Sequence, residues 1–64
     1  MSQFQLGDVV MLKSGGVLMT VKEVGDYSNF MGPVDGVMCI WQDEKGKTDT
    51  KVFEAFLLKK VEID

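Results

Sequence analysis

The apolar residues of this chain come in short runs separated by glycines and polar residues, and no stretch has the apolar spacing of a helix of three turns. Several of these runs are rich in β-branched residues, which is typical of β-strands. Five strands are predicted, at residues 8–13, 18–24, 37–42, 48–53 and 58–63. Residues 54–57 lack β-branched side chains, and we expect one short helical turn there, between the last two strands.

The segments between the predicted strands are rich in residues that favour turns. Residues 14–16 (Ser-Gly-Gly) tolerate positive φ, so they predict a tight hairpin between the first two strands. Residues 43–46 predict a second hairpin turn, with Gly46 in the left-handed position. Residues 25–36 contain three glycines and the only proline, and this density of turn-forming residues predicts a long loop.

Five short strands, tight turns and one long early loop indicate an all-β fold. A small, strongly bent antiparallel barrel suits such strands better than an open sheet, because an open sheet leaves its edges exposed. We therefore predict a five-stranded antiparallel SH3-like barrel that forms a single domain over residues 1–64. An OB-fold ranks second, because it usually needs a longer chain. A domain of this size buries only about 60% of the surface of its unfolded chain, so self-association would add useful burial.

Three segments of the chain carry a family resemblance. The first is residues 4–16 (Phe-Gln-Leu-Gly-Asp-Val-Val-Met-Leu-Lys-Ser-Gly-Gly), the second is residues 19–21 (Met-Thr-Val), and the third is Cys39-x-Trp41. Together they resemble the YodC-like family of short bacterial proteins, a domain of unknown function. The chain departs from that family's pattern at Val17, where the family has proline, and in its longer middle loop. The resemblance supports the predicted fold and implies no activity and no functional residues.

Apolar side chains occupy both faces of two predicted strands, residues 9–12 (Val-Val-Met-Leu) and the third strand. Successive side chains of a strand point to opposite faces, and a small barrel has only one interior. We expect Cys39 and Trp41 to face the core and Met38 and Ile40 to face outward. The outward set is either covered by barrel closure, the N-terminal residues, the helical turn or the long loop, or it forms a surface patch for a partner or a second copy of the chain.

The long loop carries further apolar side chains, among them Pro33, between glycines and polar residues. Such side chains either fold back over the protein's own core or contact another molecule. In SH3-like barrels a long early loop borders the peptide groove, so fold analogy points to this loop as part of a binding surface. The candidate partner-binding residues are Tyr27, Phe30, Met31, Met38, Ile40 and Trp41.

The sequence gives little support to catalysis or to metal binding. There is no histidine, and Cys39 lies between apolar neighbours, which is typical of a small buried hydrophobic residue. Asp43 and Glu44 are adjacent carboxylates in a turn, where they are normally solvated. Residues 13–16 (Lys-Ser-Gly-Gly) have the wrong order for a phosphate-binding loop, and the imidazoles or multiple thiolates of a tight metal site are missing. We expect no enzyme activity, no cofactor and no metal.

Charge favours a protein partner over a nucleic acid. All seven cationic residues are lysines, ten residues are acidic, and the net charge is −3, which opposes attraction to a phosphate backbone. The alternative is a nucleic-acid-associated barrel, in which aromatic residues stack on bases and Lys45, Lys47 and Lys51 form a local patch on one hairpin. The main hypothesis is a non-catalytic protein-interaction module, with a second copy of the chain among its candidate partners.

Two further observations bear on location. The chain has one cysteine and no N-terminal basic and apolar segment of the kind that directs export, so we expect a cytoplasmic protein. Its apolar runs are far shorter than the roughly 20 residues needed to cross a bilayer, so we expect no membrane span.

Overall fold

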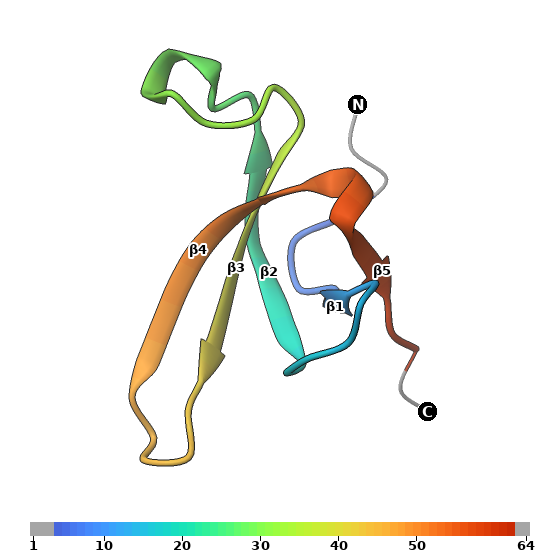
Figure 1. Cartoon of the computed structure of the whole chain (residues 1–64), viewed down its shortest axis with the longest axis vertical. Helices are drawn as coiled ribbons and strands as arrows, with labels where there is room; N and C mark the ends of the chain where they lie inside the picture. Colours follow the sequence, from blue (N-terminus) through green and yellow to red (C-terminus); the bar gives the residue numbers. More distant parts are fainter. Residues whose placement is uncertain (1–3, 63–64) are drawn as a thin grey trace.

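The computed structural model describes residues 4–62 and contains one sheet of five antiparallel strands (Figure 1). The strands are β1 (Val9–Leu12), β2 (Met19–Gly25), β3 (Gly36–Gln42), β4 (Thr48–Glu54) and β5 (Leu58–Lys60). Each overlaps its predicted range, although β5 ends at Lys60 and the last residue of the predicted strand, Ile63, lies outside the described residues. The predicted helical turn is confirmed as the 3₁₀ turn η2 (Ala55–Leu57), and a second 3₁₀ turn, η1 (Ser28–Phe30), lies in the long loop.

The strand order is β4-β3-β2-β1-β5, so the first four strands form a meander and the last strand returns to the free edge of β1. Figure 1 shows β4 curving over the molecule into η2, which leads the chain down to β5. This order, with a helical turn between the last two strands, is the arrangement of an SH3-like barrel. The predicted all-β fold of five antiparallel strands is therefore confirmed, although within residues 4–62 the sheet leaves the outer edge of β4 unpaired. No helix within residues 4–62 is long and apolar enough to span a membrane.

A β-bulge bends β2 in the middle of the sheet. The pairing of β2 with β3 shifts register between Val21 and Glu23, so that an extra residue, Lys22, is accommodated on the β2 side. A bulge of this kind bends the strand and increases its twist. The half of β2 before the bulge also pairs with β1, which allows one continuous sheet to curl around a core.

The core lies on the inner side of this curved sheet. Val37 and Cys39 of β3 point into it and are completely buried, and Trp41 packs against it while staying half-buried, so the predicted core-facing side of β3 is confirmed. The buried core residues come from β1, β2, β3 and β5, from the segment before β1 and from η2. They are Phe4, Val10, Met19, Val21, Val37, Cys39, Ala55 and Leu58. Leu12, Val24, Trp41 and Phe53 pack around them.

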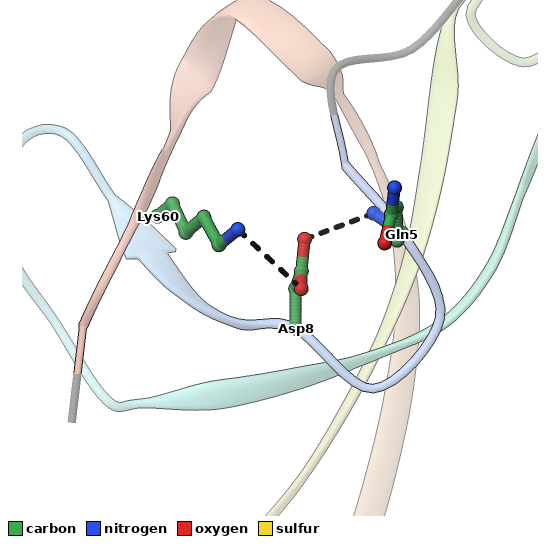
Figure 2. Close-up of polar contacts among 3 residues, drawn as sticks. All are labelled: Gln5, Asp8 and Lys60. Atoms are coloured by element: carbon green, nitrogen blue, oxygen red, sulfur yellow. Dashed lines mark hydrogen bonds and ion pairs between the residues drawn. The ribbon is translucent and has the colours of Figure 1, made fainter. Parts of the chain in front are cut away.

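The segment before β1 is fastened by Asp8 (Figure 2). One carboxylate oxygen of Asp8 accepts a hydrogen bond of 2.9 Å from the backbone N–H of Gln5, and the other lies 3.8 Å from the Lys60 ammonium nitrogen on β5. The backbone of Asp8 also accepts a bond from the N–H of Val21 on β2. These contacts hold the segment that places Phe4 in the core, whereas Leu6 stays exposed.

The hairpin between β3 and β4 has the predicted turn. The N–H of Asp43 donates to the carbonyl of Lys47 at 2.9 Å, and Gly46 has the left-handed φ of 81° that was expected. The Asp43 carboxylate accepts hydrogen bonds from the backbone N–H groups of Lys45 and Lys47 at 2.8 and 2.9 Å. Asp43 therefore stabilises the turn, which explains its place there.

Candidate functional site

The side of the β2-β3-β4 sheet that faces away from the core carries the candidate site, and we call it the outer face. Because Val37 and Cys39 point to the core, Gly36, Met38 and Ile40 point to the outer face, as predicted for the last two. Met38 and Ile40 are half-buried rather than fully exposed, because side chains of the neighbouring strands flank them on both sides.

The register of β4 adds a residue to this apolar row. Val52 lies directly opposite Met38, and Thr50 lies opposite Ile40, so the side chains of each pair share the outer face. On the other side of β3, Thr20 of β2 lies opposite Ile40. The outer face around Ile40 is therefore uncharged, with a threonine on each side.

Tyr27 covers the loop end of the outer face. A Cβ atom built on Gly36 would overlap Cδ2 of the Tyr27 ring and would lie 3.1 Å from Cγ1 of Val52, so the ring lies against both residues. The loop that carries Tyr27 is closed by hydrogen bonds from the Tyr27 N–H to the Pro33 carbonyl (3.0 Å) and from the Gly32 N–H to the Tyr27 carbonyl (2.9 Å). No described side chain of residues 26–35 belongs to the core, so the loop extends the outer face instead of covering the core.

These residues form a continuous row, which we call the outer stripe. At the end away from the loop, Leu18 is 51% exposed and borders a shallow open hollow together with Thr20 and Ile40. The outer stripe runs along the sheet through Tyr27, Val52, Met38, Ile40 and Leu18.

Acidic side chains surround the loop end of the outer stripe. Glu23 lies opposite Met38 and Glu54 lies opposite Gly36, while Asp26 and Asp35 stand at the two ends of the loop, and all four are exposed. The Ser28 N–H donates to the Asp26 carboxylate at 2.8 Å, and this hydrogen bond holds the pKa of Asp26 below its ordinary value. We call Glu23, Asp26, Asp35 and Glu54 the acidic rim.

Met31 stands apart in the same loop. Its side chain is 99% exposed, and its backbone has a φ of 62°, a left-handed conformation that glycine or asparagine adopts at lower cost. Neither burial nor backbone geometry explains a methionine at this position. The side chain of its neighbour Phe30 lies outside the described residues, so the binding role expected for Phe30 stays a prediction.

Trp41 does not share a face with Met38 and Ile40. It lies on the inner side of β3, where its ring centroid is 6.2 Å from that of Phe53, at 48° between the ring planes. The Lys51 ammonium nitrogen lies 5.6 Å from the Phe53 centroid on the same side. The candidate residues therefore do not form one cluster, because alternation along β3 places Trp41 on the opposite face. Trp41 approaches the outer stripe at the hollow that it borders together with Leu18.

The profile of one protein family matches residues 5–57 of the chain, a span that runs from the segment before β1 through η2. Its members are described as uncharacterized small proteins (DUF2158). The chain belongs to the DUF2158 family. The resemblance to the YodC-like family is consistent with this match. No curated protein and no solved structure matches the chain.

The sequence of this DUF2158 protein did not predict two members of the outer stripe, Val52 and Leu18. Both belong to predicted strands, but nothing in their local pattern links them to Met38 or Ile40. Alternation within residues 48–53 groups Val52 with Thr48 and Thr50, and that signal was available. Only the pairing of β3 with β4 shows that this group lies beside Met38 and Ile40.

Cys39, the one thiol of this DUF2158 protein, is fully buried in the core. Burial raises the pKa of the Cys39 thiol from 9.0 to about 11, which keeps it protonated, and its sulfur lies 3.8 Å from the Val37 carbonyl oxygen. Among residues 4–62 no group of three or more Cys, Asp or Glu side chains is placed to hold a metal ion.

Proposed function

We propose that this domain is a non-catalytic protein-interaction module, and that its outer stripe binds a segment of a partner protein that carries apolar and basic side chains. The observation that carries the proposal is the outer stripe itself: an uncharged apolar row on the face of the sheet that the protein's own core does not use. Contiguous apolar surface on a small monomeric protein commonly marks an interaction site.

The side-chain types of the outer stripe suit contact with a protein segment. Met38 has a flexible, polarisable side chain that adapts to different partners, and Tyr27 presents a large rigid ring with a polar tip. The exposed Met31 extends this apolar character into the loop. The central position of Ile40, between uncharged threonines, makes it the residue whose contacts we expect to contribute most to binding.

The acidic rim supports the choice of partner. Four exposed carboxylates attract lysine or arginine side chains that flank an apolar segment, and they repel phosphate groups. The hairpin that carries Lys45, Lys47 and Lys51 also carries the acidic residues Asp43, Glu44 and Asp49, which does not favour a basic stripe. Nucleic-acid association therefore ranks second.

The proposal also covers chemistry and location. A nucleophilic cysteine needs a lowered pKa and access to substrate, whereas Cys39 is buried and its pKa is raised, which supports a non-catalytic role. A single free cysteine in the core suits a reducing compartment, so we propose that the protein works in the cytoplasm.

A displayed library of random peptides, selected against the purified protein, tests the proposed function. We expect enrichment of peptides that combine apolar residues with Lys or Arg. Binding of an enriched synthetic peptide should weaken by about tenfold or more in the variants Leu18→Asp and Ile40→Asp, because each places a charge in the outer stripe. The control is Phe56→Asp, which places the same charge on an exposed apolar residue of η2, outside the outer stripe, and should bind like the wild type.

Two results would contradict the proposed function. One is an enriched peptide that binds the folded Leu18→Asp and Ile40→Asp variants as tightly as the wild type. The other is a fluorescent single-stranded oligonucleotide that binds with sub-micromolar affinity at physiological salt and loses affinity steeply as salt rises, which would favour the nucleic-acid alternative. Thermal denaturation of each variant shows that lost binding is not lost folding.

A further inference from the structure

β4 is an edge strand. It pairs with β3 along its whole length and has no second neighbour within residues 4–62 (Figure 1). The other edge of such a strand presents backbone N–H and C=O groups that can pair with another strand.

Two hydrogen bonds at the ends of the β3-β4 pair show which backbone N–H and C=O groups of β4 point to its free edge. The Asp43 N–H bonds to the Lys47 carbonyl at one end, and the Ala55 N–H bonds to the Asp35 carbonyl at the other. Hydrogen-bonded pairs alternate along an antiparallel ladder, so the odd-numbered residues of β4 bond to β3. The backbone groups of the even-numbered residues, Thr48, Thr50, Val52 and Glu54, therefore point to the free edge.

The charges on β4 are symmetric about Thr50. Asp49 and Lys51 flank it, and both lie on the inner side of the strand, opposite Trp41 and Cys39 respectively. Inward-pointing charges on an edge strand normally discourage pairing with another edge. They do so in two registers here: an antiparallel pairing centred on Asp49 sets two aspartates opposite each other, and one centred on Lys51 sets two lysines opposite each other.

A pairing centred on Thr50 has the opposite effect. It sets Asp49 of each copy opposite Lys51 of the other, at the positions without mutual hydrogen bonds, where facing side chains are closest. It also sets Thr50 opposite Thr50 and Thr48 opposite Val52 at the hydrogen-bonded positions, which uses the outward backbone groups identified above. The outward backbone groups can serve this pairing, and among the pairings centred on Asp49, Thr50 or Lys51 only the one centred on Thr50 sets opposite charges face to face.

We propose that the free edge of β4 pairs in antiparallel fashion with β4 of a second copy of this chain, with a two-fold axis at Thr50. The pairing closes after two copies, because each copy uses its β4 edge once, and so it yields a dimer rather than a fibre. The two outer faces become one continuous surface. The proposal rests on the β4 edge and its charges and does not depend on the proposed function.

Charge variants test this register, with the molar mass measured by light scattering during size-exclusion chromatography. Wild-type protein at high micromolar concentration should have twice the mass of one chain. Asp49→Lys alone sets two lysine pairs in the interface and Lys51→Asp alone sets two aspartate pairs, so each variant should have the mass of a single chain. An equimolar mixture of the two variants restores both opposite-charge pairs and should return to the mass of a dimer.

Matched controls keep the charge changes but move them off the edge. Glu23→Lys and Lys22→Asp make the same reversals on β2, and both should remain dimeric. A wild-type protein with the mass of one chain overturns the proposal, and so does a mixture of Asp49→Lys and Lys51→Asp that stays monomeric although both variants are folded. The variant Leu18→Asp, designed to weaken peptide binding, should keep the mass of a dimer, and Asp49→Lys should keep peptide binding. The dimer and the proposed function can therefore be refuted independently of each other.

Discussion

The ring of Tyr27 lies against Gly36 so closely that no other residue fits at position 36 without displacing it. Gly36 faces the outer face of β3, and the missing side chain makes room for the aromatic ring that closes the loop end of the outer stripe. Gly36 does not have a positive φ, so backbone conformation does not require glycine here. The close approach of the Tyr27 ring to its backbone does.

The variant Gly36→Ala tests this relationship. The new methyl group would overlap the Tyr27 ring and press on Val52, so we expect a loss of about 1–3 kcal/mol in the free energy of unfolding, as for other overpacked sites. Urea denaturation followed by tryptophan fluorescence measures it. In a Tyr27→Ala background the same substitution should cost much less, because the main obstacle is gone. Equal costs in both backgrounds would show that Tyr27 does not occupy this place.

The contacts of Asp8 make a second prediction, about the segment before β1. The variant Asp8→Ala removes the acceptor of the Gln5 N–H, and we expect it to lower the free energy of unfolding by about 1 kcal/mol, as loss of a capping side chain does. The variant Lys60→Gln should cost less than about 0.5 kcal/mol, because the ion pair is long and the Lys60 side chain is 56% exposed. Urea titrations compare the two variants. A larger loss for Lys60→Gln would show that the ion pair with Lys60 contributes more to stability than the hydrogen bond to Gln5.

The buried thiol of Cys39 predicts slow modification and a pH dependence. In native protein a thiol reagent should react with Cys39 only as fast as the protein unfolds, and adding urea should accelerate the reaction strongly. The folded-state pKa of about 11 lies above the ordinary 9.0, so the folded protein holds this proton more tightly than the unfolded chain. Its stabilising contribution is therefore complete below pH 9 and is lost as the pH rises from 9 to 11.

The variant Cys39→Ala is the control for that pH dependence. It has no thiol to ionise, so its free energy of unfolding should fall less between pH 9 and 11 than that of the wild type, whatever its stability at neutral pH. Parallel decreases in the two proteins, measured by urea denaturation across this range, would show that Cys39 ionises equally easily in the folded and unfolded chains.

Proline substitutions on β4 test which backbone groups face the free edge. Thr50→Pro removes an N–H that points away from β3, so the monomer should stay folded and the dimer should be lost. Asp49→Pro removes an N–H that bonds to β3, and it should lose most of its folded population. Circular dichroism and chromatographic mass measure the two effects, and a folded Asp49→Pro with an unfolded Thr50→Pro would mean that the phase of the ladder is reversed.

Much of the fold was predictable because its signals are local. Short apolar runs between turn-forming residues, several of them rich in β-branched side chains, marked the strands. The residues before Gly46 marked the β3-β4 turn, and the absence of β-branching marked η2. The period of two separated Cys39 from Met38 on β3, and the expectation that Cys39 faces the core and Met38 faces outward is confirmed.

The candidate site was less predictable. Trp41 was named as a binding candidate together with Met38 on fold analogy, although the period of two had already assigned the two residues to opposite faces of the strand. The position of Tyr27 was not predictable either, because a ring that rests on a glycine across a loop leaves no local pattern.

The sequence by itself determined which segments are extended, where the chain turns and which residues share a side of each strand, because these properties depend on neighbours one to four residues away. The tertiary structure decided which strands pair and in what register. That pairing sets Val52 beside Met38, brings Tyr27 onto Gly36 and leaves β4 as a free edge with Asp49 and Lys51 about Thr50. Register is chosen by burying one apolar face of the whole sheet at once, so it depends on residues far apart in the chain.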